Sequence, residues 1–439
     1  MLLRFVIRNF LSFYETTSFD MFPNNKRTKF ANHIYTEDEI PLLKVAAIYG
    51  ANGSGKSNFI KAFDFLRGFV TKGDYLSSLE FGLDKYFFQL AAKPSEVIFF
   101  QIEFLYQKKY YLYDVDIRKN GVSEKLSRSG LGKQENIVLF ERKGTEITSP
   151  TLPMQDAIRQ LLSQNPHTSL LYLNNQFPIL NSEDAQNAYK WFNEQTEVIT
   201  INSIVPRLIQ LLNNDKKILK FTNQVFSEIG LGIKSLDVKT TSFDDWIKHN
   251  KNADELERMV NNDTSSDNLN IARMQNNRNI LDISTQNAER RVTELLFNQI
   301  GQEGYNKQMN IRAQSDGTVR LLLLMPALYD ALYKGKIIFI DEIDNSIHPA
   351  LIYNLLHLYG VTQGNGQLIF TTHSTILLNQ QELLRPDEIW FTEKEEGNSL
   401  MYSLNDYKIH HTIDIERGYL DGRYGGVPIF HKTDDADEL

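Results

Sequence analysis

One segment constrains the possible fold of this chain more than any other: Gly50-Ala51-Asn52-Gly53-Ser54-Gly55-Lys56-Ser57. It fits G-x-x-x-x-G-K-[ST] at every fixed position, directly after the apolar run Val45–Tyr49 and directly before residues 58–70, whose apolar side chains recur at helical spacing. Glycines allow successive backbone N–H groups to point at phosphate oxygens, and the following helix presents its positive end to the same anion. The segment therefore predicts a phosphate-binding loop (P-loop) in an α/β fold. The residues expected around the nucleotide are Gly50, Asn52, Gly53, Ser54, Gly55, Lys56, Ser57 and Asn58.

A second apolar run supplies the acids that this chemistry needs. Residues 336–340 have strand length, and Asp341 and Glu342 follow at the carboxyl end, where ligands collect in α/β sheets. Lys56 is expected to reach the β- and γ-phosphates, while Ser57 and Asp341 hold Mg²⁺. Glu342 is expected to polarise a water for attack on the γ-phosphate. The adjacent acids, and the lack of an Asn-Lys-x-Asp guanine-reading sequence, favour ATP over GTP.

Two further elements complete the predicted site. His373 follows the apolar strand 367–371 and is expected to contact the γ-phosphate or the attacking water. The predicted catalytic residues are therefore Glu342, His373 and Lys56. Ser315 and Gly317 offer a hydroxyl and a backbone N–H just before the apolar helix predicted for residues 319–332. Taken alone, they fit a helix cap as well as a nucleotide contact.

The order of the other patterns predicts the domain organisation. Residues 2–19 have the character of one or two edge strands, and 97–117 that of an antiparallel pair turning near Gln107 and Lys108. Helical patterns cover 154–230, and a polar excursion lies near 249–279. The strand at 45–49 and the late strands are expected to share one sheet. The predicted domains are an N-terminal half with the P-loop and an antiparallel β lobe at 1–120, a mainly helical insertion at 121–300, a C-terminal half at 301–430 and an acidic tail at 431–439.

Composition excludes several classes of protein. The 439 residues include 55 acidic and 47 basic side chains, for a net charge of -8, and no cysteine. Disulfide scaffolds, Cys-ligated zinc, iron–sulfur sites and thiol nucleophiles are therefore excluded. Arg4 and Arg8 interrupt the N-terminal apolar run too early for a signal peptide, and the run at 321–332 falls short of a membrane span. We expect a cytoplasmic protein without membrane contact, and the acidic balance disfavours a chain adapted throughout to nucleic acid.

The motifs resemble those of a known group of ATPases. The P-loop, Ser315–Gly317, Asp341-Glu342 and His373 together are similar to the ATP-binding-cassette (ABC) ATPases of the SMC, RecF and OLD type, as is the N-terminal segment 5–13. More specifically, residues 47–58, 315–318, 341–349 and 418–428 look like the RloA/AbiLi-type ATPases of bacterial abortive-infection and restriction-linked loci. The C-terminal Gly-Tyr-Leu-x-Gly-Arg-Tyr-Gly element is the most discriminating of these. The fold implied is an ABC/SMC-type P-loop ATPase head with a mixed sheet, an antiparallel β lobe and a helical insertion.

This resemblance also implies an assembly and a partner. It implies ATP hydrolysis with Mg²⁺ in a head-to-tail homodimer or higher homo-oligomer, each nucleotide lying between Lys56 of one copy and Ser315 of another. Asn345 and Ser346 would lie near the dimer seam. The expected glutamine ligand of the metal has Gln89 as its candidate, with Gln101 as the alternative. The implied partner is a separate TOPRIM (RloB-type) nuclease from the same locus, through which any nucleic acid would mainly be contacted.

Two other functions remain open. One is a RecF-like ATPase of recombination or repair that binds DNA itself, with Lys216, Lys217 and Lys220 as basic residues, although these lysines also fit an ordinary solvated helix face. The other is a scaffold that binds ATP without hydrolysing it. The presence of Glu342 disfavours the scaffold.

Overall fold

The chain divides into two compact units. The computed structural model describes residues 1–36, 38–148, 155–178, 180–203, 205, 208–249, 271–275, 278–286, 289–362, 364–378, 383–408 and 414–427. The first of the two units, which we call the P-loop unit, comprises Met1–Thr200, Asp330–Asp344 and Leu355–Leu439. The second, which we call the insertion unit, comprises Ile201–Tyr329 and Asn345–Asn354. Helices α9 (Asp316–Lys334) and α10 (Pro349–Val361) each contribute residues to both units.

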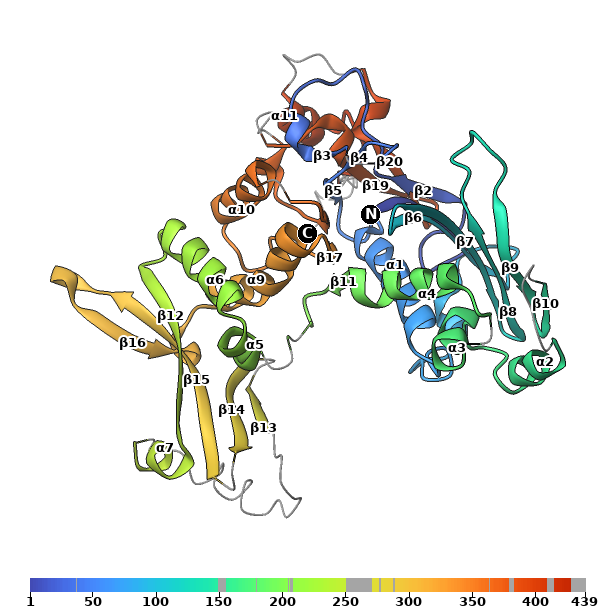
Figure 1. Cartoon of the computed structure of the whole chain (residues 1–439). Coiled ribbons are helices and arrows are strands. Elements are labelled where there is room, and N and C mark those ends of the chain that lie inside the picture. The colour runs from blue at the N-terminus through green and yellow to red at the C-terminus, as the bar shows by residue number, and fades with distance from the viewer. Residues whose placement is uncertain are drawn as a thin grey trace, which may run out of the picture. The chain divides into compact units, whose positions relative to one another are not determined.

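A six-stranded mixed sheet positions the predicted site in the P-loop unit (Figure 1). Its strands, in spatial order, are β11 (Thr196–Ile199), β17 (Ile337–Ile340), β18 (Gln367–Thr371), β5 (Val45–Gly50), β19 (Ile389–Glu395) and β20 (Asn398–Ser403). The first five run parallel and β20 pairs antiparallel with β19. Strands β17, β18 and β5 are fully buried, as expected for apolar runs covered on both faces. The prediction that strand 45–49 shares a sheet with the late strands is confirmed.

A seven-stranded antiparallel sheet forms the β lobe of the same unit. Its order is β10 (Glu146–Thr148), β9 (Ile137–Lys143), β8 (Gly121–Arg128), β7 (Lys109–Arg118), β6 (Ile98–Tyr106), β1 (Leu2–Arg8) and β2 (Thr17–Asp20). Strands β6 and β7 turn at Gln107 and Lys108, which both have positive φ, so the predicted pair is confirmed. Of the one or two edge strands predicted within residues 2–19, β2 lies at the edge of this sheet, whereas β1 lies between β2 and the distant β6, a partner that local pattern does not reveal. A two-stranded pair joins β3 (Ile34–Tyr35) to β4 (Leu42–Leu43).

Helix α1 packs against strands of both sheets. It runs over Lys56–Thr71, and its apolar face includes Phe59 and Phe63. The Phe63 ring stacks on Phe339 of β17 at 3.8 Å between centroids, and Phe59 meets Phe5 of β1 edge-on at 5.9 Å. This double contact fixes the start of α1, and with it the loop that precedes α1. The other helices of the unit are α2 (Gln155–Gln164), α3 (Leu170–Gln176), α4 (Glu183–Lys190) with the π-turn Trp191–Gln195, and α11 (Ile415–Leu420).

The insertion unit has its own sheet and core. Strands β12 (Ile233–Ser242), β15 (Glu289–Ile300), β14 (Arg278–Gln286) and β13 (Ile271–Gln275) are antiparallel, and β16 (Asn306–Asn310) also pairs with β15. The helices are α5 (Leu208–Asn214), α6 (Lys216–Glu228) and α7 (Phe243–His249). A small core joins α7 to the sheet through Phe243, Trp246, Leu281, Ile283 and Val292.

The predicted α/β class with a mixed sheet and an antiparallel lobe is confirmed, but the predicted domain boundaries differ from the structure. The units divide after Thr200 and after Tyr329, not at 120 and 300. Residues 121–300, predicted as mainly helical, hold helices between 155 and 228 and at 243–249, but strands at 121–128, 137–143, 146–148, 196–199, 233–242, 271–275, 278–286 and 289–300. The segment 289–300 is rich in helix formers such as Glu, Arg and Leu, yet pairing with β12 and β14 makes it a strand, so tertiary contacts override propensity there.

Two predicted segments lie wholly or partly outside the described residues. Of the polar excursion at 249–279, residues 250–270 lie outside the described residues, whereas 271–275 form β13. The acidic tail at 431–439 also lies outside them. Among the helices that the structure describes, none combines the length and apolar character needed to cross a membrane.

Candidate nucleotide-binding site

The P-loop joins β5 to α1 through three glycines with positive φ, Gly50 (155°), Gly53 (78°) and Gly55 (119°). A Cβ added at Gly50 would collide with Thr392 of β19, and one at Gly55 would collide with Ser399 of β20. Nothing lies within 4 Å of a Cβ added at Gly53, so there only the backbone conformation requires glycine. The loop is therefore held closely against the last two strands of the mixed sheet.

Polar side chains fix the same loop. The Ser54 hydroxyl lies 2.6 Å from the Thr392 hydroxyl, and the Ser399 hydroxyl donates to the Ser54 carbonyl at 2.7 Å. The Asn58 amide donates to the Ser12 hydroxyl at 2.8 Å. Asn52 is exposed in the loop. Ser54 and Asn58, predicted around the nucleotide, thus also brace the loop from behind.

Lys56 is a buried cation inside the loop. Its Nζ donates to the backbone carbonyls of Gly50 at 2.7 Å and Ala51 at 3.0 Å. Burial lowers the pKa of Lys56 from 10.5 to about 8, against the opposing influence of Glu342 and Asp341. A buried ammonium held by neutral carbonyls gains strongly from an approaching anion. Lys56 therefore fits the phosphates of a nucleotide.

Ser57 and Asp341 meet although 284 residues separate them in sequence. The Ser57 hydroxyl donates to Asp341 Oδ1 at 3.0 Å, and the Thr371 hydroxyl donates to the same oxygen at 2.7 Å. A hydroxyl beside a buried carboxylate fits Mg²⁺, which keeps water and phosphate oxygens in its shell and needs one or two protein carboxylates. The described residues contain no cluster of three or more His, Asp or Glu side chains arranged to hold a metal. When bound there, Mg²⁺ would offset negative charge on the phosphates.

Glu342 adopts a backbone conformation that is unusual for its type. Its φ is 51°, in the left-handed region, which costs on the order of 1 kcal/mol for a residue with a Cβ. Its backbone N–H donates to the Thr371 hydroxyl at 2.7 Å. Thr371 therefore bonds to both acids at once, accepting from Glu342 and donating to Asp341. Strain of this kind persists where surrounding contacts hold it, and it is common at functional sites.

His373 lies in the loop after β18, with an exposed side chain. Its backbone N–H donates to Asp344 Oδ2 at 3.0 Å. Partial burial and then the Lys56 charge lower the pKa of His373, while Asp344, Glu342 and Asp341 oppose the shift. The ring is therefore neutral at physiological pH, able to accept one hydrogen bond and donate another. These influences put His373 in the same electrostatic environment as Lys56 and the two acids.

The insertion unit holds the Ser315–Gly317 segment. The Ser315 hydroxyl accepts from the Thr318 backbone N–H at 3.2 Å, so Ser315 caps α9, as one of the two alternatives predicted. A Cβ added at Gly317 would collide with the Ser346 carbonyl. Ser346 has a φ of 61°, and its hydroxyl donates to Asn345 Oδ1 at 3.1 Å. The segments predicted at the dimer seam, Ser315–Gly317 and Asn345-Ser346, are therefore neighbours within this unit.

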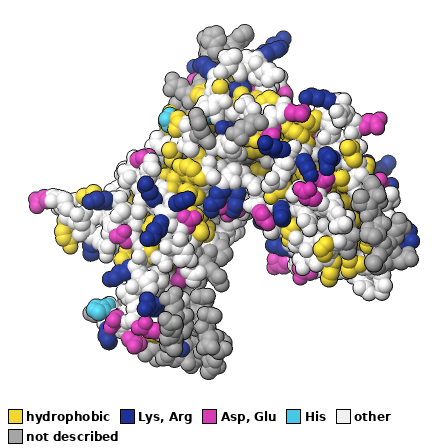
Figure 2. Space-filling view, viewed as in Figure 1, with side chains coloured by type: hydrophobic (Ala, Val, Ile, Leu, Met, Phe, Trp, Pro, Cys, Tyr) yellow, Lys and Arg dark blue, Asp and Glu magenta, His cyan; other side chains and the backbone are white. Residues whose placement is uncertain are grey.

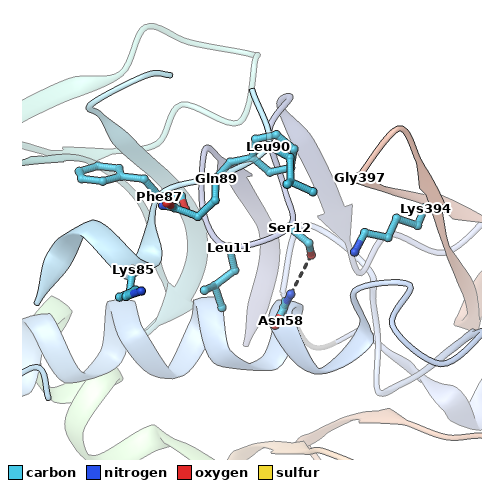
Figure 3. A pocket seen from close by; sticks show the side chains of 10 residues that line it. Leu11, Ser12, Asn58, Lys85, Phe87, Gln89, Leu90, Lys394 and Gly397 are labelled. Carbon is cyan, nitrogen blue, oxygen red and sulfur yellow. Dashed lines mark hydrogen bonds between the residues drawn. The ribbon is translucent and has the colours of Figure 1, made fainter. Parts of the chain in front are cut away.

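Gln89 lies in a pocket of about 240 Å³ with Leu11, Ser12, Asn58 and Lys394 (Figure 3). Its amide donates to the backbone carbonyls of Asp84 at 2.7 Å and Phe87 at 2.8 Å. The alternative, Gln101, donates to Asp114 Oδ1 at 2.7 Å across β6 and β7. Both amides are thus engaged in local hydrogen bonds away from Ser57 and Asp341. The structure gives no support to the prediction that Gln89 is a metal ligand.

Four residues that sequence reasoning did not select support the site: Thr371, Asp344, Thr392 and Ser399. A polar side chain at the carboxyl end of a buried strand is a signal that could have identified Thr371, and Asp344 stands close behind the Asp341-Glu342 pair. Thr392 and Ser399 carry no such signal, because they reach the P-loop from strands more than 300 residues later in the chain.

Residues 45–379 match the family described as "AAA domain, putative AbiEii toxin, Type IV TA system". The DNA replication and repair protein RecF of Carboxydothermus hydrogenoformans is 25% identical to this chain over 211 residues, which are 46% of this chain and 58% of RecF. The chain therefore spans a little over half the length of that curated relative.

Solved structures similar to this chain include three SMC heads. One is bound to the C-winged helix domain of ScpA, with 14% identity, 92% of this chain and 97% of the other covered, and a TM-score of 0.45. The SMC head domain from Thermotoga maritima has 11% identity, coverage of 93% and 99%, and a TM-score of 0.43. The third, an Smc head with an extended coiled coil bound to the C-terminal domain of ScpA derived from Pyrococcus furiosus, has 13% identity, coverage of 96% and 98%, and a TM-score of 0.45.

Proposed function

This chain belongs to the AbiEii-type AAA-domain family, and on that premise we propose that it hydrolyses ATP to ADP and phosphate in a bacterial anti-phage defence system. In that role it is a nucleotide-gated sensor or scaffold that controls a separate toxic effector, a TOPRIM (RloB-type) nuclease from the same locus. The site residues proposed are those predicted from the sequence, apart from Gln89.

One observation carries the ATPase part of the proposal. Asp341 Oδ1 accepts hydrogen bonds from both Ser57 and Thr371, and the same Thr371 hydroxyl accepts from the backbone of Glu342. The proposed metal ligand Asp341 and the proposed base Glu342 are thus joined to one another through a single threonine. Preorganisation of this kind is what phosphoryl transfer requires, because catalysis there consists mainly of positioning and charge stabilisation.

In the proposed reaction, each residue of the P-loop unit has one task. Lys56 binds phosphate oxygens by charge, and the P-loop amides orient them. Glu342 orients a water for attack on the γ-phosphate and takes up its proton. His373, with its neutral ring, holds either that water or a γ-phosphate oxygen by a hydrogen bond.

The second half of the site is proposed to come from another copy. Ser315 and Gly317 present a helix N-terminus, with a hydroxyl and backbone N–H groups, which suits the phosphates of a nucleotide bound at the partner's Lys56. A head-to-tail dimer of this kind has two equivalent sites related by a twofold axis.

A simple experiment tests the ATPase proposal. Purified chain with Mg²⁺-ATP should release phosphate, and Lys56→Ala should lose both ATP binding and turnover, with an unchanged circular dichroism spectrum as evidence of folding. Hydrolysis that survives in Lys56→Ala would refute this site.

The effector proposal rests on the family and on the resemblance of residues 418–428, so it needs a test of its own. Co-expression with the neighbouring TOPRIM gene should yield an ATP-dependent complex. If the purified chain binds no product of its own locus, with or without ATP, the effector proposal fails while the ATPase proposal stands.

The similarity to RecF favours one second candidate, an ATPase that binds DNA by itself. The charge distribution gives it little help, because basic side chains on the face of the insertion unit seen in Figure 2 are interspersed with acidic ones. ATP-dependent DNA binding by the isolated chain, with log affinity falling linearly against log salt concentration, would favour this candidate.

A further inference from the structure

The C-terminal element Gly418–Val427 packs directly behind the P-loop. The Tyr419 hydroxyl donates to the Gly426 carbonyl at 3.1 Å. A Cβ added at Gly426 would come within 3.5 Å of the Gly50 Cα. One phenol therefore holds the turn that follows α11, and this turn lies against the first residue of the P-loop.

Aromatic packing makes this tie rigid. The Tyr419 ring stacks on Phe391 of β19 at 5.3 Å between centroids and meets Tyr49 edge-on at 6.0 Å. Tyr424, from the same element, stacks on Phe391 at 5.9 Å. Because β19 and β5 are adjacent parallel strands, the element is anchored to the two strands that support the P-loop.

Helix α11 also reaches the loop that carries His373. The hydroxyl of Thr375, which lies two residues after His373, donates to Glu416 Oε1 at 2.8 Å. The bond from the His373 backbone N–H to Asp344 also holds this loop. Glu416 and Tyr419 are one helical turn apart, so one short helix contacts the histidine loop and also holds the turn that lies against the phosphate-binding loop.

From this geometry we propose that α11 is a brace for the nucleotide site, in which Tyr419 is a positioning residue for the P-loop and the Thr375–Glu416 pair a positioning contact for His373. The inference rests on the proposed ATPase function and adds residues to it. It also gives the Gly-Tyr-Leu-x-Gly-Arg-Tyr-Gly element a task at the site: Tyr419 holds Gly426 by a hydrogen bond, and the glycine at 426 permits close approach to Gly50.

The two contacts should act on different kinetic parameters. The P-loop holds the nucleotide in the ground state and in the transition state, so a displaced Gly50 weakens binding in both and raises KM. The histidine loop is proposed to act on the γ-phosphate or the water during reaction, so its displacement lowers kcat. A general loss of folding would instead change both parameters together with the melting temperature.

The test uses three single-group deletions in the full chain, with Mg²⁺-ATP as substrate. Tyr419→Phe should raise KM about five- to tenfold and leave kcat within about twofold, the size expected for one hydrogen bond. Thr375→Val should lower kcat by a similar factor at unchanged KM, and Thr375→Ser, which keeps the hydroxyl, should restore it. Tyr402→Phe is the matched control, because Tyr402 donates to the Tyr424 carbonyl of the same element and not to Gly426, the residue that approaches Gly50. It should leave both parameters within about twofold.

The outcomes separate the inference from the function on which it rests. Equal effects of Tyr419→Phe and Tyr402→Phe, or no split between KM and kcat, would overturn the brace while leaving the ATPase intact. A wild-type chain without turnover would refute the ATPase, and binding of Mg²⁺-ADP then tests the brace alone, with weaker binding expected for Tyr419→Phe than for Tyr402→Phe. Equal Mg²⁺-ADP binding by those two variants would overturn it.

Discussion

In the P-loop unit, the candidate site residues come from the ends of three parallel strands and are joined by side-chain hydrogen bonds, from Ser57 through Asp341 and Thr371 to Glu342. In the insertion unit, Ser315 and Gly317 lie at one helix start, where they contact Thr318 and Ser346 of the same unit. We propose that the first arrangement binds and activates the nucleotide and that the second adds hydrogen-bond donors to a nucleotide held elsewhere.

This difference teaches where catalysis and where control can lie. The P-loop unit contains the cation, the proposed metal ligands and the proposed base, so binding and the chemical step depend on it. Gly317 lies against the Ser346 carbonyl. This contact connects the Ser315–Gly317 segment to residues that follow β17 and the Asp341-Glu342 pair. We therefore expect changes in the P-loop unit to affect binding or chemistry in each copy, and changes in the insertion unit to affect assembly of the complete site.

The largest expected effect is that of Glu342→Gln in the P-loop unit. Loss of the base should reduce kcat by about 10²- to 10⁴-fold while ATP still binds, because the amide keeps the shape but cannot take up the proton. Single-turnover phosphate release measures the loss, and size-exclusion chromatography with ATP should show a persistent dimer. Unchanged phosphate release would show that Glu342 is not the base.

A smaller effect is expected from Gly317→Ala in the insertion unit. The added methyl group collides with the Ser346 carbonyl, so turnover should fall about tenfold to a hundredfold, while ATP binding by the monomer stays unchanged. Gly301→Ala in the same unit is the control, because its new methyl group meets neighbours at 3.4 Å or more. A loss of ATP binding in Gly317→Ala would contradict the separation between the two units.

A more moderate change in ATP affinity is expected as pH rises. Since burial lowers the pKa of Lys56 to about 8, the ammonium that binds phosphate is lost as pH rises above this value. ATP affinity should therefore fall by up to about tenfold per pH unit above pH 8. The effect of pH on folding stability without nucleotide has the opposite sign. Between about pH 8 and 10.5 the folded state binds fewer protons at Lys56 than the unfolded state does, so Lys56 makes the chain more stable as pH rises through this range.

Titration of ATP binding between pH 7 and 9.5 measures this effect. In Lys56→Arg, whose guanidinium stays charged over this range, the decline should be absent. An equal decline in both proteins would show that another group titrates.

The smallest expected effect is a change in the free energy of unfolding, caused by a substitution in the structural core of the P-loop unit and not in the candidate site. Within the described part of the chain, the buried Tyr49 hydroxyl has no hydrogen-bond partner, so Tyr49→Phe should change the free energy of unfolding by less than about 0.5 kcal/mol or stabilise the chain. Tyr113→Phe is the matched control, since the Tyr113 hydroxyl donates to the buried Glu124, and its loss should cost about 1.5–3 kcal/mol. Urea unfolding of both variants measures the difference, and a cost for Tyr49→Phe equal to that of Tyr113→Phe would show that the Tyr49 hydroxyl is paired.

The same contrast explains how much could be predicted from the sequence. The nucleotide site of the P-loop unit depends on short motifs at the ends of apolar strands, so the amino-acid sequence alone is enough to predict that Lys56, Ser57 and Asp341 meet. The sheet of the insertion unit depends on pairing between distant segments, and the local composition of β15, rich in helix formers, favours a helix instead. The approach of Gly426 to Gly50 was equally beyond reach, because nothing local to residue 426 marks its partner.

The most direct test of the central claim mixes an inactive chain with a strongly impaired one. Lys56→Ala lacks the P-loop cation but keeps an unaltered Ser315–Gly317 segment. Gly317→Ala keeps the P-loop cation but has an altered Ser315–Gly317 segment. If each site is composed of a P-loop unit from one copy and an insertion unit from another, a mixed dimer contains one intact site, and the mixture should regain roughly a quarter of wild-type ATP turnover. Turnover in the mixture no higher than the sum of the two separate chains would contradict the shared site.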